Sequence, residues 1–410
     1  MPSSQPPLSG PLSGIKVLDL SRVLAGPWSG QMLGDLGAEV IKVEQPGQGD
    51  DTRKWGPPFL ADGSRDSAYY LCANRNKRSV AIDLSKPEGQ ELVRQLAAQA
   101  DIVLENFRVG GLAKYGLDYP SLKAVKPDLI YCSITGFGQT GPDKDKGGYD
   151  FLIQGMSGLM SVTGDADGHP LKVGIPVSDL TTGLYATISI LAALQHRNRT
   201  GEGQHIDLAL LDAQMALLAN QGSNWLNGGA EPRRMGNQHP TIVPYQDFAC
   251  ADGDIIIALG NDRQFRDLVH VLGLPDMAED PRFATNVERA RNRLALAPMV
   301  TELIRQFPRD VLLERLTAHG IPCGRVAGLH EALTSERTQR GGLVQNMPHP
   351  VAGSTHVFAP PYRLDGQRLP IRNAPPTLGE GTREVLTQLL QMTDAQLEAL
   401  RAQGVLTLPE

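Results

Sequence analysis

The residue best suited to do chemistry is an aspartate directly before a long apolar segment. Asp179 lies in the sequence Val177-Ser-Asp-Leu-Thr-Thr-Gly183, where a polar stretch gives way to a helical apolar pattern. A carboxylate there accepts hydrogen bonds from helix amides, and the positive end of the helix dipole favours its ionised form. An ionised but poorly solvated carboxylate can attack an acyl carbon. The pattern therefore predicts a nucleophile, with a plain helix N-cap as the alternative.

Two glycine-containing loops are the next candidates, because glycine lets a backbone approach a ligand closely. Residues 136–141, Gly-Phe-Gly-Gln-Thr-Gly, have the spacing of a dinucleotide-binding loop, but more loop residues follow instead of the required helix. We therefore expect a flexible, ligand-facing loop there. The second loop contains Gly236, Asn237, Gln238 and His239. It can cover a site and donate to an oxyanion, or it can be structural only.

Basic residues suggest contacts to an anion. A compact run, Asn74-Arg75-Asn76-Lys77-Arg78, precedes a predicted strand, and Arg53 and Lys114 are further candidates. A phosphate-bearing ligand needs fixed cations and helix N-termini, and the turn at residues 23–27 can present such amides. The alternative for each cation is a solvated charged edge. The nine histidines show no metal-ligand spacing, so we expect no metal.

An alternation of strands and helices must position these residues. In the first 135 residues, short apolar runs typical of buried strands alternate with helical apolar spacing. This pattern predicts parallel βαβ units in an open α/β sheet of Rossmann type. The predicted strands are 15–20, 38–44, 80–84, 102–105 and 129–133, and the predicted helices are 28–36, 88–100 and 112–125.

The rest of the chain predicts a smaller second module. An apolar helix, a strand and another helix are expected at 180–197, 206–210 and 212–220, before a stretch rich in glycine and proline that is typical of a linker. A small α+β segment is then expected, with a strand at 255–259 and helices at 264–272, 290–306 and 311–319. A proline-rich extended stretch at 348–376 and helices at 382–391 and 393–403 end the chain.

Composition narrows the class of protein. The chain has 410 residues, of which 41% are apolar, and a formal net charge of −6, so it lacks the basic surplus of a general nucleic-acid binder. The four cysteines have neither metal-knuckle nor disulfide-framework spacing. The N-terminus does not read as a signal peptide, and the most apolar segment, 184–194, is shorter than the roughly 20 residues that span a bilayer. We expect a cytoplasmic protein that binds neither nucleic acid nor membrane.

Ordered blocks of residues run along the chain from about Leu12. They are VLDLSRVLAGPWSGQMLGDLGAEVIKVE, GDDTRKWGPPF, NRNKRSVAIDL with KPEG, ENF, YCSITGFGQTGP, GYD, SDLTTGLYA, TGEGQHIDLALLDA, GNQHP, PYQ, GIPCG and APPTLGEGTREVL. Together these blocks resemble the class III CoA-transferase family, also called the formyl-CoA transferase or CaiB/BaiF family. Within the family, the likeness is best to the branch that uses succinyl-CoA and dicarboxylates of the glutarate type.

The resemblance implies an α/β fold with a Rossmann-like large domain and a smaller α+β domain. It also implies a homodimer of two ring-like chains that are interlocked. The large domain would combine residues 1–221 with 331–410, where the latter begin with a return linker. Residues 222–245 would form the first linker, and 246–330 the small domain.

The resemblance also makes Asp179 the catalytic residue of CoA transfer from an acyl-CoA donor, such as succinyl-CoA, to a small acid such as glutarate. Asp179 would attack the donor thioester to form a mixed anhydride and release the CoA thiolate. The thiolate would attack the aspartyl carbonyl, which gives an enzyme-bound thioester and frees the donor acid, and the acceptor carboxylate would reverse these steps. CoA is then a substrate, and no cofactor is tightly bound.

By the same resemblance, CoA would lie along the first βα turn against the backbone of Leu24 and Ala25. Lys114 stands where relatives place an arginine, and Gln45 stands where several relatives carry a basic residue. The loop at 236–239 would close over the intermediates. The other implied CoA contacts are Ile82, Asp83, Leu84, Ser85, Asn106, Phe107, Tyr149 and Asp150.

Three other functions are weighed against this one. The α-methylacyl-CoA racemases share the fold and the aspartate, but they carry His-Asp where this chain has Tyr149-Asp150, and a phenol is a poor base at neutral pH. A non-catalytic CoA-binding protein is disfavoured by the presence of Asp179 together with the glycine-rich loops. A dehydrogenase is disfavoured because the dinucleotide-binding glycines are missing.

Overall fold

The computed structural model describes residues 10–60, 66–229 and 231–408, and the chain divides into two compact units. The larger unit takes in the chain up to Leu159, Val173–Gly222, and everything from Glu336 onward. The smaller unit comprises Met160–Lys172 and Ser223–Ser335. Both ends of the chain therefore contribute to the larger unit.

The larger unit is built on a seven-stranded sheet with the strand order β12-β3-β2-β1-β4-β5-β6. The first six strands are parallel to their neighbours, and only β12 at one edge runs antiparallel, beside β3. The order reverses between β1 and β4, and in open α/β sheets ligands bind in the crevice at that point. The strands are β1 Lys16–Asp19, β2 Glu39–Glu44, β3 Lys77–Ile82, β4 Ile102–Glu105, β5 Ile130–Thr135, β6 His205–Ala209 and β12 Leu406–Thr407.

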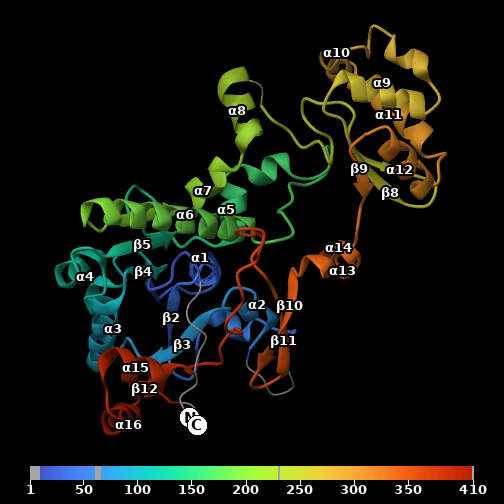
Figure 1. The fold of residues 1–410 in the computed structure, drawn as a ribbon. Helices are drawn as coiled ribbons and strands as arrows, with labels where there is room; N and C mark the ends of the chain where they lie inside the picture. Colours follow the sequence, from blue (N-terminus) through green and yellow to red (C-terminus); the bar gives the residue numbers. More distant parts are fainter. Residues whose placement is uncertain (1–9, 61–65, 230, 409–410) are drawn as a thin grey trace. The chain divides into compact units, whose positions relative to one another are not determined.

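Helices cover both faces of this sheet, as the alternation of side chains along each strand requires. Val17 packs on the face covered by α1 (Ala25–Asp35) and α6 (Val177–Thr200), whereas its neighbour Leu18 packs on the opposite face. Figure 1 shows the C-terminal helices, drawn in red, beside α3. The helices of that second face are α3 Pro87–Gln99, α4 Tyr119–Val125, α15 Thr382–Leu390 and α16 Asp394–Ala402.

Shorter elements complete the larger unit. Two antiparallel strands, β10 and β11, form a hairpin that begins before residue 348 and overlaps the first part of the stretch expected to be extended and proline-rich. The shorter elements are η1 Asp51–Lys54, α2 Ala68–Leu71, η2 Ala113–Tyr115, α5 Asp150–Met156, α7 Leu210–Ala216, α14 Glu336–Gly341, β10 Val344–His349 and β11 Gly353–Phe358. Two further elements, η3 Leu159–Val162 and α8 Ala219–Gly228, lie where the chain passes between units.

The smaller unit has its own hydrophobic core around an antiparallel sheet of order β7-β8-β9. Asn261 caps α9 by accepting a hydrogen bond from the amide of Gln264, and Thr285 caps α10 in the same way through Glu288. Its elements are β7 Tyr245–Ala249, β8 Asp254–Ala258, α9 Asp262–Val271, η4 Pro275–Ala278, α10 Asn286–Arg291, α11 Arg293–Ile304, α12 Arg309–Ala318, β9 Cys323–Arg325 and α13 Leu329–Thr334.

Several sequence predictions need correction. The helix expected at 112–125 is interrupted, because Gly116 takes a left-handed φ of +64° and a new, short helix begins at Tyr119 with Pro120 in its first turn. The linker expected at 222–245 begins with the second half of helix α8. Strand β3 begins at Lys77 and not at residue 80, so it includes Lys77 and Arg78 of the basic run that was expected to precede it.

The apolar segment before the linker is also longer than expected. Helix α6 has 24 residues and is long and apolar enough to cross a membrane by length and composition alone. Half of its most apolar window is nevertheless buried inside the structure, and a core helix of this kind passes the same test. The prediction that this segment is too short is therefore wrong, although its packing against the sheet is that of a core helix.

Candidate active site

Asp179 lies in the first turn of α6, two residues after the helix begins at Val177. The N-cap position belongs to Pro176, so the alternative interpretation of Asp179 as an N-cap is wrong. The side chain is buried, with 8% of its surface exposed. Among the described residues, no hydrogen bond reaches its carboxylate, which leaves both oxygens free to meet a ligand.

The N-terminus of α6 is capped by a different carboxylate. Oδ1 of Asp150 accepts hydrogen bonds from the amides of Ser178 at 2.8 Å and Asp179 at 3.3 Å, and Oδ2 accepts from Nε2 of Gln154 at 2.7 Å. Asp150 thus takes the helix amides that the sequence analysis assigned to Asp179. Burial, and then the negative charge of Asp150, raise the pKa of Asp179 to about 7. The expectation of an easily ionised carboxylate is therefore wrong.

Asp179 faces a cavity of about 180 Å³, which we call the Asp179 cavity. One wall is the turn between β1 and α1, including Leu24 and Ala25. Other walls are formed by Asn106 and Phe107 after β4, and by the glycine-rich segment after β5. The complete lining is Arg22, Val23, Leu24, Ala25, Asp51, Asn106, Phe107, Arg108, Val109, Ile134, Thr135, Gly136, Lys144, Lys146, Gly147, Gly148, Tyr149, Asp179 and Leu210.

Glycine is required in one wall of this cavity. A Cβ atom on Gly136 would lie 2.7 Å from Cα of Gly148, so only glycine allows these two backbone segments to meet. No helix begins until Asp150, which agrees with a ligand-facing loop and not with a dinucleotide-binding loop.

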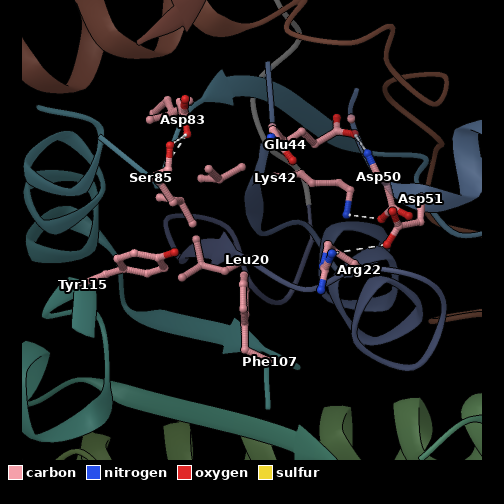
Figure 2. Close-up of a pocket in the computed structure, with 15 residues that line it drawn as sticks. Leu20, Arg22, Lys42, Glu44, Asp50, Asp51, Asp83, Ser85, Phe107 and Tyr115 are labelled. Carbon is pink, nitrogen blue, oxygen red and sulfur yellow. Dashed lines mark hydrogen bonds and ion pairs between the residues drawn. The ribbon is translucent and has the colours of Figure 1, made fainter. Parts of the chain in front are cut away.

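A second cavity, of about 210 Å³, lies where β1, β2 and β3 end (Figure 2). We call it the strand-end cavity. It contains several residues expected to contact CoA, namely Gln45, the segment Ile82–Ser85, and Phe107. Arg22, Asp51 and Phe107 line both cavities, so the two adjoin each other in the same unit. Their union can take a ligand that is longer than either cavity.

Charged pairs form the floor of the strand-end cavity. Nζ of Lys42 lies 2.9 Å from Oδ2 of Asp50, and both side chains are fully buried. Burial alone would raise the pKa of Asp50, but the Lys42 ammonium and the hydrogen bonds from Thr52 lower it to about 2. At the rim, Arg22 pairs with Asp51 at 3.3 Å (Figure 2). The buried pair is therefore ionised at neutral pH and fixes the loop after β2.

Most of the other candidate cations are committed to protein carboxylates. Arg53 is buried against Glu44 and Asp66, and Arg75 against Asp35. Lys77 and Arg78 pair with Asp19 and Glu39, respectively. Because these residues bind carboxylates within the larger unit, they form neither the site for a bound anion nor the solvated charged edge that the sequence analysis considered. Lys114 differs, because its Nζ lies over the ring of Tyr115, 4.6 Å from the centroid, and Tyr115 lines the strand-end cavity.

The second candidate loop belongs to the smaller unit, whereas Asp179 belongs to the larger one. The amide of Gly236, at a φ of +58°, donates to the carbonyl of Gly164. Nδ1 of His239 accepts from the amides of Thr241 at 3.2 Å and Ile242 at 3.1 Å, which leaves the ring proton on Nε2. Arg293 donates to the side chain of Gln238 and to the carbonyl of His239. Nδ1 of the imidazole thus has structural partners, whereas Nε2 has none among the residues that the structure describes. Asn237 completes the loop.

No cluster of three or more histidine, cysteine or acidic side chains suited to a metal ion occurs in residues 10–60, 66–229 and 231–408. Sequence reasoning missed Arg22 and Asp51, which line both cavities, and the buried pair Lys42 and Asp50, which lines the strand-end cavity. The signal for Asp50 was its place in the GDDTRKWGPPF block, whereas Lys42 lies in the strand predicted at 38–44 and was not singled out.

In open α/β sheets ligands bind at the carboxyl ends of the strands, and a cavity there that contains a buried carboxylate with a raised pKa is typical of an enzyme active site. Comparison with known proteins narrows this class. The family model described as CoA-transferase family III matches residues 12–382, and the chain belongs to that family.

Curated relatives and solved structures match almost the whole chain. The succinate–glutarate CoA-transferase of Agrobacterium fabrum is 49% identical, over 95% of this chain and 97% of its own length. The succinyl-CoA:glutarate CoA-transferase of Mus musculus is 42% identical, over 97% of this chain and 90% of its own length. The crystal structure of a CaiB/BaiF family protein from Brucella suis has a TM-score of 0.82 and 48% identity, and covers 93% of this chain and 99% of its own.

Proposed function

We propose that the protein transfers CoA from succinyl-CoA to a short dicarboxylate such as glutarate, with Asp179 as the nucleophile. The observation that carries this proposal is the buried Asp179 carboxylate, which has no hydrogen-bond partner among the described residues and opens on a cavity that adjoins a second one. The names of the relatives from Agrobacterium fabrum and Mus musculus support the donor and the acceptor.

The proposed reaction has four steps, each an acyl transfer. An oxygen of Asp179 attacks the thioester carbonyl of succinyl-CoA, the C–S bond breaks, and CoA leaves as a thiolate from an aspartyl–succinyl anhydride. The thiolate attacks the aspartyl carbonyl, so succinate leaves and an aspartyl–CoA thioester remains. The acceptor carboxylate attacks this thioester to form a second anhydride and release the thiolate. The thiolate then attacks the acceptor acyl carbon, which yields the new acyl-CoA and regenerates Asp179.

The two adjoining cavities suggest how CoA lies. We place its adenosine and diphosphate in the strand-end cavity, along Gln45 and the segment Ile82–Ser85, with Lys114 near the rim. The pantetheine would pass Arg22 and Phe107 into the Asp179 cavity, which puts the thioester beside the backbone of Leu24 and Ala25. The contacts proposed near the thioester and the diphosphate are Asn106, Tyr149 and Asp150, and the loop of Gly236, Asn237, Gln238 and His239 would cover the intermediates.

We also propose that the sheet, with its strand order 3-2-1-4-5-6, acts as a Rossmann-like CoA-binding fold, and that the enzyme is a homodimer. Exposed apolar side chains gather on the neighbouring helices α5, α6 and α7, which supports a partner chain there. They are Phe151, Leu152, Met156, Leu184, Tyr185, Ile188 and Met215. The four thiols are free, which supports a cytoplasmic location, and we propose that CoA is a substrate and that no cofactor is tightly bound.

The test combines a substitution with chemical trapping. Asp179→Asn should abolish transfer from succinyl-CoA to glutarate, followed by mass spectrometry of the CoA thioesters, while CoA binding measured by calorimetry is kept. In the unsubstituted enzyme, hydroxylamine or borohydride added during turnover should modify the peptide that carries Asp179. Substantial turnover in the variant, or an unmodified peptide during rapid exchange, would exclude the covalent mechanism. Glutarate, itaconate and malate offered as separate acceptors would identify the preferred acid.

A further inference from the structure

The turn between β1 and α1 contains a strained residue. Val23 has a φ of +69°, in the left-handed region that β-branched residues rarely enter because Cβ approaches the backbone too closely. Glycine would adopt this conformation without strain. The turn lines the Asp179 cavity through residues 22–25, so the strained residue stands at the wall where the thioester is proposed to bind.

Asn106, which follows β4, holds the peptide unit in front of Val23. Its Oδ1 accepts a hydrogen bond from the amide of Arg22 at 2.8 Å, and its Nδ2 donates to the carbonyl of the same residue at 2.6 Å. Both ends of the side-chain amide are therefore committed to one residue of the turn. This leaves the backbone and the outer surface of Asn106 for any contact to CoA.

The buried ion pair beneath the strand-end cavity holds the turn from the other side. Oδ1 of Asp50 accepts from the amide of Val23 at 3.3 Å and from the amide of Thr52 at 3.0 Å. Lys42, paired with Asp50, donates to the carbonyl of Ser21 at 2.8 Å. Since Ser21 also donates its amide to Asp19 at 2.9 Å, every backbone polar group from the amide of Ser21 to that of Val23 has a side-chain partner.

We infer that Asn106, together with the Lys42–Asp50 pair, forms a clamp that keeps Val23 in the left-handed conformation and so aims the backbone of Leu24 and Ala25 at the acyl-CoA. These three side chains are positioning residues, because they act through the turn. Helix α1, which begins at Ala25, has no side-chain cap and no acidic residue in its first turn, so its first amides remain available to the ligand. The inference rests on the proposed binding of acyl-CoA at this turn.

The experiment tests whether removing the strain at Val23 makes the clamp unnecessary, with the KM for succinyl-CoA as the readout. In Asn106→Ala the turn loses its clamp, and we expect the KM for succinyl-CoA to rise about tenfold or more, with a much smaller change in the KM for glutarate. Val23→Gly alone should raise the KM for succinyl-CoA less than Asn106→Ala does, because glycine accepts a positive φ. In the double variant Asn106→Ala/Val23→Gly, most of the lost affinity for succinyl-CoA should return, since the glycine turn needs less restraint.

Asn292→Ala is the matched control. Asn292 lies in the smaller unit, and its amide also donates to two backbone carbonyls, those of Arg282 and Glu288. It should affect stability but not the KM for succinyl-CoA. An unchanged KM in Asn106→Ala would overturn the inference, and so would a double variant as impaired as Asn106→Ala, because Asn106 would then act by touching the ligand.

Failure of the proposed function can be told apart from failure of the clamp. Calorimetric titration with CoA alone needs no turnover, and the clamp predicts weaker CoA binding in Asn106→Ala, with recovery in the double variant. If the unsubstituted enzyme transfers CoA to no acid while these affinities follow the expected order, the proposed function fails and the clamp stands. If transfer is normal and the affinities do not change, the clamp fails and the proposed function stands.

Discussion

At the scale of single residues, the chemistry depends on the different environments of two carboxylates, Asp150 and Asp179, at the N-terminus of α6. Asp150 accepts hydrogen bonds from the amides at the start of α6, while the side chain of Asp179, in the same first turn, is buried beside the negative charge of Asp150. Raising the pKa of a carboxylate increases the nucleophilicity of its anion but reduces the fraction ionised. A value of about 7 balances the two near neutral pH.

The pH dependence of the reaction should report this balance. Since the anion of Asp179 attacks, kcat/KM for succinyl-CoA should fall as the pH drops through about 7, because the Asp179 carboxylate of the free enzyme becomes protonated there. In Asp150→Asn, the asparagine oxygen still caps α6 but its charge is gone. The acidic limb should therefore shift to lower pH, while burial keeps it above the ordinary range for aspartate.

Glu314→Gln is the control for this shift, because Glu314 is an exposed residue of helix α12 in the smaller unit. Its pH profile should match that of the unsubstituted enzyme. An acidic limb that stays in place in Asp150→Asn would show that Asp150 does not set the ionisation of Asp179.

The same burial should reduce the stability of the fold. The folded-state pKa of Asp179 lies above the ordinary value of 3.8, so its contribution to the free energy of unfolding declines as the pH rises from about 4 towards 7. Asp179→Asn removes the cost of a buried charge, and at pH 8 its melting temperature should exceed that of the unsubstituted enzyme by about 2 °C or more. The gain should vanish near pH 4, and thermal unfolding at both pH values measures it. A variant that melts lower at pH 8 would contradict this account.

The position of Asp179 could be predicted from sequence, but its ionisation could not. The polar stretch before an apolar segment marks a helix start, and that start lies three residues before the first residue of the predicted helix. Which carboxylate takes the helix amides depends on Asp150, 29 residues earlier in the chain. The basic run at 74–78 shows the same limit, because the pairing of Arg75 with Asp35 spans 40 residues and leaves no local pattern.

At the scale of elements, the site depends on close packing between helices α1 and α6. A Cβ atom on Gly183 would lie 2.7 Å from the carbonyl oxygen of Ala25 and 3.0 Å from Cδ1 of Trp28. The absence of a side chain at Gly183 therefore lets α6 bring Asp179 close to the turn before α1. The short apolar strands and the helices between them could be predicted, because the period of their apolar residues is visible in the local sequence. The contact of Gly183 with helix α1 joins residues far apart in the chain, so no local pattern indicates it.

Gly183→Ala should force the two helices apart. We expect it to lower the free energy of unfolding by about 1–3 kcal/mol, as overpacking of a core commonly does. It should also reduce kcat for CoA transfer, because Asp179 lies one turn away on the same helix. Urea unfolding and steady-state kinetics measure the two effects.

Gly174→Ala is the matched control for this substitution, since no atom lies within 4 Å of a Cβ built at that position. It should leave the free energy of unfolding nearly unchanged. Equal stability of both variants would mean that the contact between α1 and α6 is looser than the distances indicate.

At the scale of the whole molecule, the two ends of the chain meet in one sheet. Strand β12 pairs with β3, so the C-terminus contributes an edge to a sheet that the N-terminal half begins. Sequence patterns predicted a smaller second module, and the resemblance to the family implied that both ends of the chain form the larger one. They did not assign Met160–Lys172 to the smaller unit, because a short segment without strong periodicity carries no signal of its partner.

The exposed apolar face on α5, α6 and α7 leads to the last prediction, on the proposed homodimer. Leu184 and Ile188 lie one turn apart on α6 and are 45% and 61% exposed. If this face is covered by a second copy of the chain, the double variant Leu184→Asp/Ile188→Asp places two carboxylates in a dry interface. The dissociation constant of its dimer should rise more than about a hundredfold, which sedimentation and light scattering can measure.

Val125→Asp is the control for this double variant. Val125 is 55% exposed on helix α4, against the opposite face of the sheet, and its substitution should leave the dimer intact. A double variant that stays dimeric would place the interface elsewhere, and an unsubstituted protein that is monomeric at micromolar concentration would exclude the homodimer altogether.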